Sequence, residues 1–104
     1  MKIAICSKED NIASEVESRF GRCRFFALYD SVDYSITFID NTAESLTEGA
    51  GPAALELLKD KGVEKIISGN FGFKLKALAS DASIQLIVLK EKHTIKDIIQ
   101  LLHH

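Results

Sequence analysis

Hydrophobic and polar positions follow one another in patterns that predict five strands and three helices. Short, nearly unbroken apolar runs at Ile3–Cys6 and Ile84–Leu89 are typical of strands covered on both faces. Phe25–Asp30 and Ile36–Asn41 also favour strands, and the short segment between them predicts a hairpin whose strands run antiparallel. In the second strand of the hairpin, the alternating pattern of side chains indicates an edge strand with one face more exposed than the other.

The centre of the chain, from Glu48 to Asn70, predicts a glycine-rich loop, a helix, a strand and a second glycine-bearing loop. Pro52, the only proline, suits the first helical position, where a missing N–H costs nothing. Gly62 suits the left-handed residue that follows a helix end. Val63–Ser68 then favours a strand, which the Gly-Asn pair after it ends.

Two later segments predict helices by their periodicity. After Phe73, one helical face collects Leu75, Leu78, Ala79 and Ala82. The last helix begins with a capping box, Thr94-Ile95-Lys96-Asp97, and its apolar stripe consists of Ile95, Ile98, Ile99 and Leu102. The element order is therefore β-β-β-α-β-α-β-α.

A hairpin followed by two crossovers predicts an α/β fold. We expect a five-stranded mixed sheet whose first strand is central and whose second strand alone runs antiparallel. Ligands of such sheets bind at the carboxyl ends of the parallel strands. Four segments fall at that edge: Cys6, Gly49–Gly51, Ser68–Gly72 and Arg22–Arg24. These segments are remote in sequence and are expected to meet in one place.

The composition indicates a single globular domain and disfavours nucleic acid and acidic membranes as partners. The 104 residues, 46% of them hydrophobic and 27% charged, are typical of a single globular domain. A formal net charge of −2 does not favour nucleic acid or an acidic membrane surface as a partner. No apolar run approaches a membrane span or a signal peptide, and two distant cysteines suggest free thiols, so we expect a cytoplasmic location. The terminal His103 and His104 receive no role.

All three arginines of the chain, Arg19, Arg22 and Arg24, fall within six positions. The forked guanidinium suits bidentate contact with carboxylate or phosphate, so the cluster favours an anion-binding role. The alternative is a solvated basic loop that pairs with Glu15 or Glu17.

The glycine-rich loop Gly49-Ala50-Gly51 adds a second candidate anion contact. The first N–H groups of the helix that follows have no partner within the helix, and its positive end suits an anion. A tight turn that needs glycine explains so short a pattern somewhat better when it is taken alone.

Four motifs together resemble the dinitrogenase iron–molybdenum cofactor biosynthesis family, the small nitrogenase-accessory cofactor carriers. They are Ser18–Arg22, Tyr29-Asp30, Gly49–Gly51 and Ser68–Gly72, and the similarity runs nearly end to end. The resemblance implies a ribonuclease-H-like three-layer fold. It also implies that the chain binds iron–molybdenum cofactor or its iron–sulfur precursor and hands it on without catalysis. The partners would be proteins that donate or accept the metallocluster.

The sequence departs from the family pattern at two positions. Arg19 stands where the family usually has a histidine, which is a favoured candidate for contact with the cluster. Cys23 stands where a small apolar residue is more usual, and its arginine neighbours favour a thiolate that could take over as iron ligand. Cys6 is the second candidate metal ligand, although a cysteine at the end of a buried strand more often packs as a small apolar residue. Without a Cys-x-x-Cys pair, a four-thiolate site within one chain is excluded.

The residues expected to bind the cofactor are Arg19, Phe20, Gly21, Arg22, Cys23, Gly49, Ala50, Gly51, Gly69 and Asn70. The alternative function is a metal-free, non-enzymatic module that binds an anion or small ligand in the same pocket. A two-metal nuclease is disfavoured, because the first strand, Lys2–Cys6, carries no carboxylate. We expect a monomer, or a weak homodimer formed through the exposed edge of the hairpin.

Overall fold

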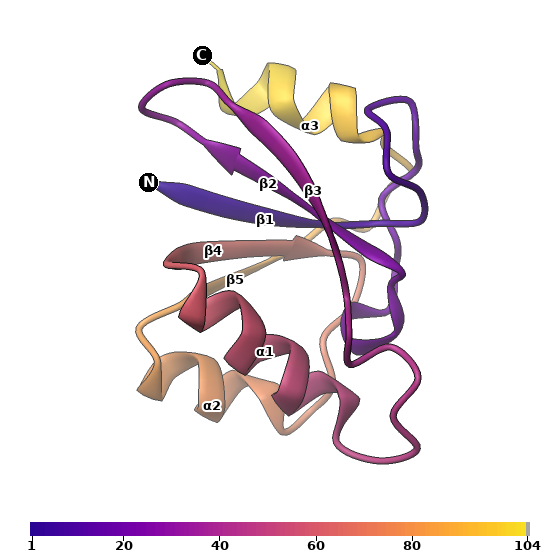
Figure 1. The fold of residues 1–104 in the computed structure, drawn as a ribbon, viewed down its shortest axis with the longest axis vertical. Coiled ribbons are helices and arrows are strands. Elements are labelled where there is room, and N and C mark those ends of the chain that lie inside the picture. Colours follow the sequence, from indigo (N-terminus) through magenta and orange to yellow (C-terminus); the bar gives the residue numbers. More distant parts are fainter. Residues whose placement is uncertain (104) are drawn as a thin grey trace.

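A five-stranded mixed sheet with helices on both faces forms the fold (Figure 1). The computed structural model describes residues 1–103. The strands are β1 (Lys2–Ser7), β2 (Phe25–Asp30), β3 (Ile36–Asp40), β4 (Val63–Ser68) and β5 (Gln85–Val88). The helices are the 3-10 helix η1 (Phe20–Arg22) and the α-helices α1 (Ala50–Asp60), α2 (Leu75–Asp81) and α3 (Ile95–Leu102).

The predicted topology is confirmed. The strand order is β3-β2-β1-β4-β5, so β1 is central. The β1–β2 and β2–β3 pairs are antiparallel, whereas the β1–β4 and β4–β5 pairs are parallel. Only β2 therefore runs against the other strands. The carboxyl ends of β1, β4 and β5 and the amino end of β2 meet at one edge of the sheet.

The sheet separates two apolar cores. Helices α1 and α2 cover one face and α3 covers the other, which gives the three-layer arrangement that the resemblance implies (Figure 1). Alternation along β1 divides its side chains between them, with Ala4 and Cys6 in the α1–α2 core and Ile3 and Ile5 in the α3 core. Both faces of β1 are buried, as its unbroken apolar run predicts.

Helix α1 begins two residues earlier than predicted. Its first residue is Ala50, so Pro52 occupies the third helical position and not the first. The first bond of the helix runs from the N–H of Ala53 to the carbonyl of Gly49 (3.0 Å), so the missing proline N–H still costs nothing. Gly49 precedes the helix with a left-handed φ of 73°, and Gly62 follows its end with a φ of 79°, as predicted for Gly62.

The burial predicted for α2 and β5 is partly wrong. Leu75 and Ala79 are buried, but Leu78 is 41% exposed because α2 has only seven residues and covers the margin of the sheet. Strand β5 spans Gln85–Val88 and lies at the outer edge of the sheet, so Val88 is 48% exposed. An edge strand lacks the neighbour that would cover both its faces, and an unbroken apolar run does not reveal this.

The long polar loop after β1 ties the sheet to α3. Val16 donates its N–H to the carbonyl of His93 (2.9 Å), and Ile95 donates to the carbonyl of Ser14 (2.9 Å). Lys96 donates in the same way to the carbonyl of Ile12 (2.9 Å). The loop therefore satisfies N–H groups in the first turn of α3, which a helix cannot bond internally.

The end of α3 closes over the β2–β3 hairpin. The hydroxyl of Tyr29 lies 3.4 Å from Nδ1 of His103, and the ring centroids of His103 and Tyr34 are 4.4 Å apart. The sequence assigned no role to His103, and His104 lies outside the described residues. No helix within residues 1–103 is long and apolar enough to cross a membrane.

The predicted capping box of α3 is present, and it makes the free energy of unfolding depend on pH. The N–H of Thr94 donates to the Asp97 carboxylate (3.0 Å), and this bond lowers the pKa of Asp97. A lowered folded-state pKa contributes stability above the unfolded pKa, and this contribution is lost as pH falls through the folded value. Asp97→Asn should therefore show a smaller loss of stability below about pH 4 than the parent. Urea unfolding at a series of pH values measures this.

The matched control for this experiment is Asp10→Asn, which removes an exposed carboxylate from the loop after β1. It should keep the acid dependence of the parent. Identical slopes of unfolding free energy against pH in the parent and in Asp97→Asn would contradict the role assigned to the capping box.

Candidate functional site

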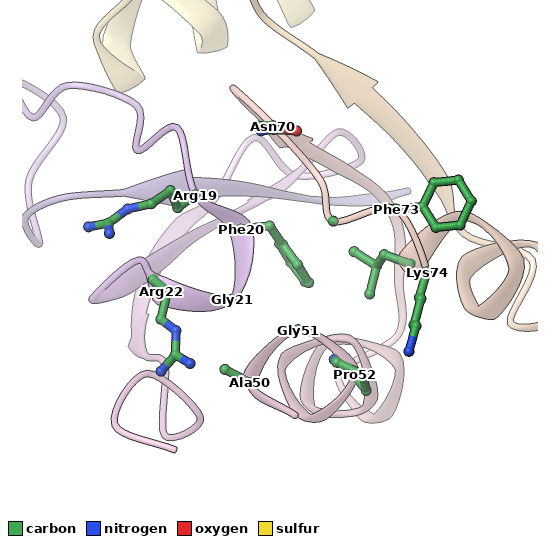
Figure 2. A pocket seen from close by; sticks show the side chains of 12 residues that line it. Arg19, Phe20, Gly21, Arg22, Ala50, Gly51, Pro52, Asn70, Phe73 and Lys74 are labelled. Carbon is green, nitrogen blue, oxygen red and sulfur yellow. The ribbon is translucent and has the colours of Figure 1, made fainter. Parts of the chain in front are cut away.

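A pocket of about 520 Å³ lies at the sheet edge where three of the four predicted segments meet (Figure 2). Its walls come from η1, the first turn of α1 and the loop between β4 and α2. The lining residues are Arg19, Phe20, Gly21, Arg22, Ala50, Gly51, Pro52, Asn70, Gly72, Phe73, Lys74 and Leu75. The predicted convergence is therefore observed for these three segments, whereas Cys6, the fourth, lies in the buried core.

Two glycines let these segments touch backbone to backbone. A Cβ on Gly21 would lie 2.7 Å from the nitrogen and 2.9 Å from the Cα of Gly51 in α1. A Cβ on Gly69 would lie 2.7 Å from the Cα of Ser18. Real Cβ atoms do not approach backbone so closely, so both positions require glycine for contact rather than for a turn.

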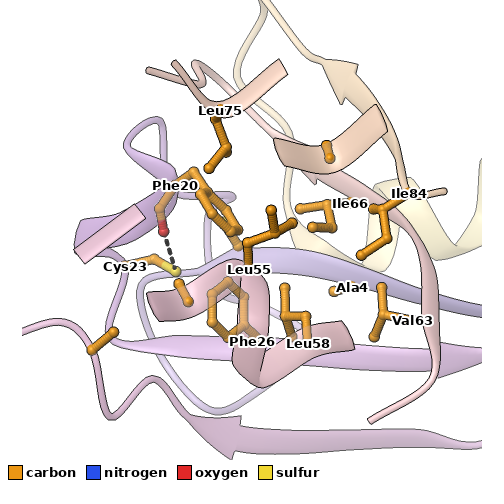
Figure 3. Close-up of a cluster of buried hydrophobic side chains, with 14 residues drawn as sticks. Ala4, Phe20, Cys23, Phe26, Leu55, Leu58, Val63, Ile66, Leu75 and Ile84 are labelled. Atoms are coloured by element: carbon orange, nitrogen blue, oxygen red, sulfur yellow. Dashed lines mark hydrogen bonds between the residues drawn. The ribbon is translucent and has the colours of Figure 1, made fainter. Parts of the chain in front are cut away.

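Phe20 separates the pocket from the core beneath it. Its ring is buried and packs against Phe26 (centroids 5.7 Å apart) and Phe71 (5.5 Å), each in a tilted arrangement. Figure 3 shows the ring between Leu75 of α2 and Leu55 of α1. One side chain thus serves as the apolar floor of the pocket and as part of the α1–α2 core.

Arg22 holds the loop before α1. Its guanidinium donates to the backbone carbonyls of Glu44 (2.9 Å), Leu46 and Thr47 (3.4 Å). The sequence predicts that this fork binds an anion, but in the structure its N–H groups bond to neutral carbonyls of the same chain. Arg22 therefore lines the pocket, while both Nη1 hydrogens and one Nη2 hydrogen are directed to the loop.

The other two arginines differ in their surroundings. Arg19 is 73% exposed at its side chain, and its Nε lies 3.6 Å from the carboxylate of Glu17. This is one of the two pairings expected for a solvated loop. Arg24 lies over the ring of Phe25, 5.2 Å from its centroid, and does not line the pocket. Arg19 therefore lines the pocket with an exposed side chain, and its guanidinium is directed away from the Phe20 ring (Figure 2).

Lys74 and Phe73 belong to the pocket and were missed by the sequence interpretation. Lys74 precedes α2, and no described carboxylate lies within ion-pair distance of it. Phe73 is 97% exposed at the rim. Figure 2 shows Arg19 and Lys74 on opposite sides of the pocket, with Phe20 between them. No signal in the sequence marks either residue, because the exposure of Phe73 and the direction of Lys74 are known only from the structure.

Asn70 connects the loop after β4 to the arginine segment. It forms an isolated parallel bridge with Arg19, and its carbonyl accepts from the N–H of Phe20 (3.4 Å). The buried hydroxyl of Ser68 lies 3.3 Å from the carbonyls of Glu17 and Asn70, among others. These bonds hold the Asn70 backbone in place at the pocket wall.

Both cysteines are buried in the α1–α2 core and neither lines the pocket. The thiol of Cys23 donates to the carbonyl of Phe20 (3.2 Å), as Figure 3 shows. Burial raises the pKa of the Cys6 thiol well above its usual range, and the neighbouring Cys23 thiol raises it further. The sequence interpretation placed Cys23 beside the charges of Arg22 and Arg24, but the structure turns its side chain inward.

Seven of the ten predicted cofactor-binding residues line the pocket: Arg19, Phe20, Gly21, Arg22, Ala50, Gly51 and Asn70. Gly49, Gly69 and Cys23 adjoin it in sequence without lining it. Within residues 1–103, no three His, Cys, Asp or Glu side chains come together as a metal site. The lining can therefore offer cations, helix N–H groups and an apolar floor.

Comparison with known proteins gives a family and a set of structural neighbours. A family model described as dinitrogenase iron-molybdenum cofactor matches residues 1–104. The apo form of the orange protein from Desulfovibrio gigas has a TM-score of 0.90 at 25% identity, over 97% of this chain and 85% of that chain. A NifB-like protein from Thermotoga, solved by NMR, has a TM-score of 0.82 at 28% identity over the same shares. A search of curated proteins found no match.

The contact between η1 and α1 predicts the effect of a single methyl group. Gly21→Ala should destabilise the fold by about 1–3 kcal/mol, because the added Cβ forces backbone apart at the pocket wall. Gly72→Ala is the matched control, since nothing lies within 4 Å of a Cβ there, and it should change stability little. Urea unfolding of the two variants measures both effects, and equal stabilities would contradict the packing described.

Burial of the thiols predicts slow chemical labelling. At about pH 8 the native protein should react slowly with an aromatic disulfide reagent, because neither sulfur reaches solvent and the pKa of Cys6 is raised. The same chain in denaturing urea should release two equivalents at once. Immediate reaction of one thiol in the native protein, lost in Cys23→Ala, would show that Cys23 presents a thiolate at the surface.

Proposed function

Because the chain belongs to the dinitrogenase iron-molybdenum cofactor family, we propose that it binds an anionic iron–sulfur metallocluster and hands it on without catalysis. The cargo would be iron–molybdenum cofactor or a precursor of it. The match over residues 1–104 supports a role in cofactor assembly. The likeness to a protein solved in an apo form and to a NifB-like protein also supports it.

The observation that carries the proposal is the pocket at the sheet edge. A cluster that bears an organic acid is anionic, and the pocket brings Arg19 and Lys74 to opposite sides of one cavity. The first turn of α1 adds N–H groups that have no partner within the helix, at Ala50 and Gly51. These groups would attract a negative charge, while Phe20 would cover the apolar part of the ligand.

The lining also favours release of the cargo. None of the residues that line the pocket is a cysteine, histidine, aspartate or glutamate. A cluster in the pocket would therefore be held by charge, hydrogen bonds and packing rather than by bonds to its metal ions. Ligation by Cys23 or Cys6 remains a separate prediction that requires the core beneath Phe20 to open.

The same lining favours a second candidate function. A pocket with cations, an apolar floor and no metal-ligating side chain also suits a small organic anion. In that case the protein is a metal-free binding module on the same fold. Anion binding without retention of iron would identify this function.

The proposed partners are proteins that donate or accept the cluster in the cytoplasm, where free cysteines persist. Phe73 at the pocket rim offers such a partner an exposed aromatic contact. The net charge of −2 gives no support to binding of nucleic acid or an acidic membrane.

Loading under anaerobic conditions tests the carrier function. The parent should retain iron after gel filtration when it is supplied with iron and sulfide or with pre-assembled cofactor. The double variant Arg19→Gln, Lys74→Gln should retain it about tenfold less tightly, since two charged contacts are lost. Arg24→Gln removes the same charge type outside the pocket and should behave as the parent.

Three further outcomes are decisive. If the parent retains no iron with either supply, the carrier function fails and the metal-free module replaces it. Loss of iron in Cys23→Ala, with a fold as stable as the parent, would show ligation by that thiol. Full retention of iron in both Cys23→Ala and Cys6→Ala would show binding through the pocket lining alone.

A further inference from the structure

We propose that Arg22 is a positioning residue, which sets the shape of the pocket by fixing the loop before α1 and does not itself contact the ligand. The inference rests on the proposed function, because it assigns a role within the same pocket. It reverses the expectation from sequence that Arg22, together with Arg19, is an anion contact.

The guanidinium of Arg22 bonds to the backbone of the loop before α1. Arg22 donates to the carbonyls of Glu44, Leu46 and Thr47, three residues that span the connection from β3 to α1. A loop with no regular secondary structure is thereby held at several points by one side chain. A ligand would have to compete with those carbonyls for the Nη1 hydrogens and for one Nη2 hydrogen, and only the Nε–H and the second Nη2–H lie outside these three bonds.

Asn41 supplies a second tie between the same two segments. Its buried side-chain amide donates to the carbonyls of Gly21 (3.1 Å) and Cys23 (2.9 Å), and its oxygen accepts from the N–H of Ala43 (3.1 Å). Asn41 therefore fixes the start of the loop, and Arg22 fixes its middle and end. The segment 19–24 and the segment 41–47 behave as one unit.

The loop leads directly into the helix that forms the pocket wall. Thr47 lies two residues before Gly49, the left-handed residue that precedes α1. The first turn of α1 is in backbone contact with Gly21, the neighbour of Arg22. If the loop moves, the N–H groups of Ala50 and Gly51 move with it. Arg22 thus controls the direction of groups that it does not touch.

Arginine is required for this task because of its geometry. Its planar fork can address several carbonyls at once, whereas the ammonium of lysine is a compact point charge on a flexible stem. A positioning role therefore predicts that Arg22→Lys fails although the charge is kept. A ligand-contact role predicts that Arg22→Lys largely succeeds.

The test compares Arg22→Lys and Arg22→Gln with the parent, using citrate as the probe and calorimetry at several salt concentrations. Both variants should bind citrate about tenfold more weakly than the parent, the scale seen when a supporting residue is removed from a binding site. Their affinities should fall with salt as steeply as that of the parent, because no charge that contacts the ligand has been lost.

Two controls separate positioning from general effects. Arg24→Gln removes a nearby charge that lies over Phe25, and it should keep the parent affinity. Ile98→Val weakens the α3 core on the opposite face of the sheet, and it should lower stability without changing affinity. Loss of citrate binding in Ile98→Val would show that affinity merely follows stability and would overturn the proposal.

Arg22→Lys with parent affinity, combined with weak binding and a shallower salt dependence in Arg22→Gln, would also overturn it and establish a direct charge contact. If the parent itself does not bind citrate, anion binding by the pocket fails as a function. The role of Arg22 is then decided without ligand, by the NMR amide signals of Ala50 and Gly51. Signals that shift in Arg22→Lys but not in Arg24→Gln support positioning, and unshifted signals overturn it.

Discussion

The architecture of the pocket depends on the contact between Gly21 and the first turn of α1. Because no side chain separates the two backbones, η1 lies directly against the helix, and Phe20 is directed down into the core while the flanking residues remain at the surface. The same contact places the free N–H end of α1 on the wall of the pocket that Arg19 and Asn70 also line. Without it the three segments that line the pocket would still share a sheet edge, but they would not enclose a cavity.

Much of the fold could be predicted from the sequence because the pattern of burial is local information. The division of β1 between two cores, the β2–β3 hairpin and the capping box at Thr94 all follow from spacing within a few residues. The errors arose where burial depends on neighbours remote in sequence. Val88 looks like a core residue until β5 is known to be the last strand of the sheet.

The pocket lies at the sheet edge that the sequence predicted, but some side chains expected to face it are directed elsewhere. Topology brings Arg19, Gly51 and Asn70 together, and topology was predictable. The direction of a side chain was not, because it depends on acceptors that exist only after folding. Arg22 turns to the carbonyls of Glu44, Leu46 and Thr47, and Cys23 turns to that of Phe20. Lys74 and Phe73 had no cluster to mark them, so only the folded loop showed that they face the pocket.

The separation of the two cores has a consequence for engineering. The face covered by α3 is built from Ile3, Ile5, Ile67, Ile95 and Ile98, together with Ala27 and Tyr29, and none of these residues lines the pocket. Thermostability could therefore be raised by redesigning that face, while the residues around the cavity keep their native mobility. A scaffold of this kind offers two independently adjustable halves, one for the lifetime of the protein and one for the exchange rate of a ligand bound in the cavity.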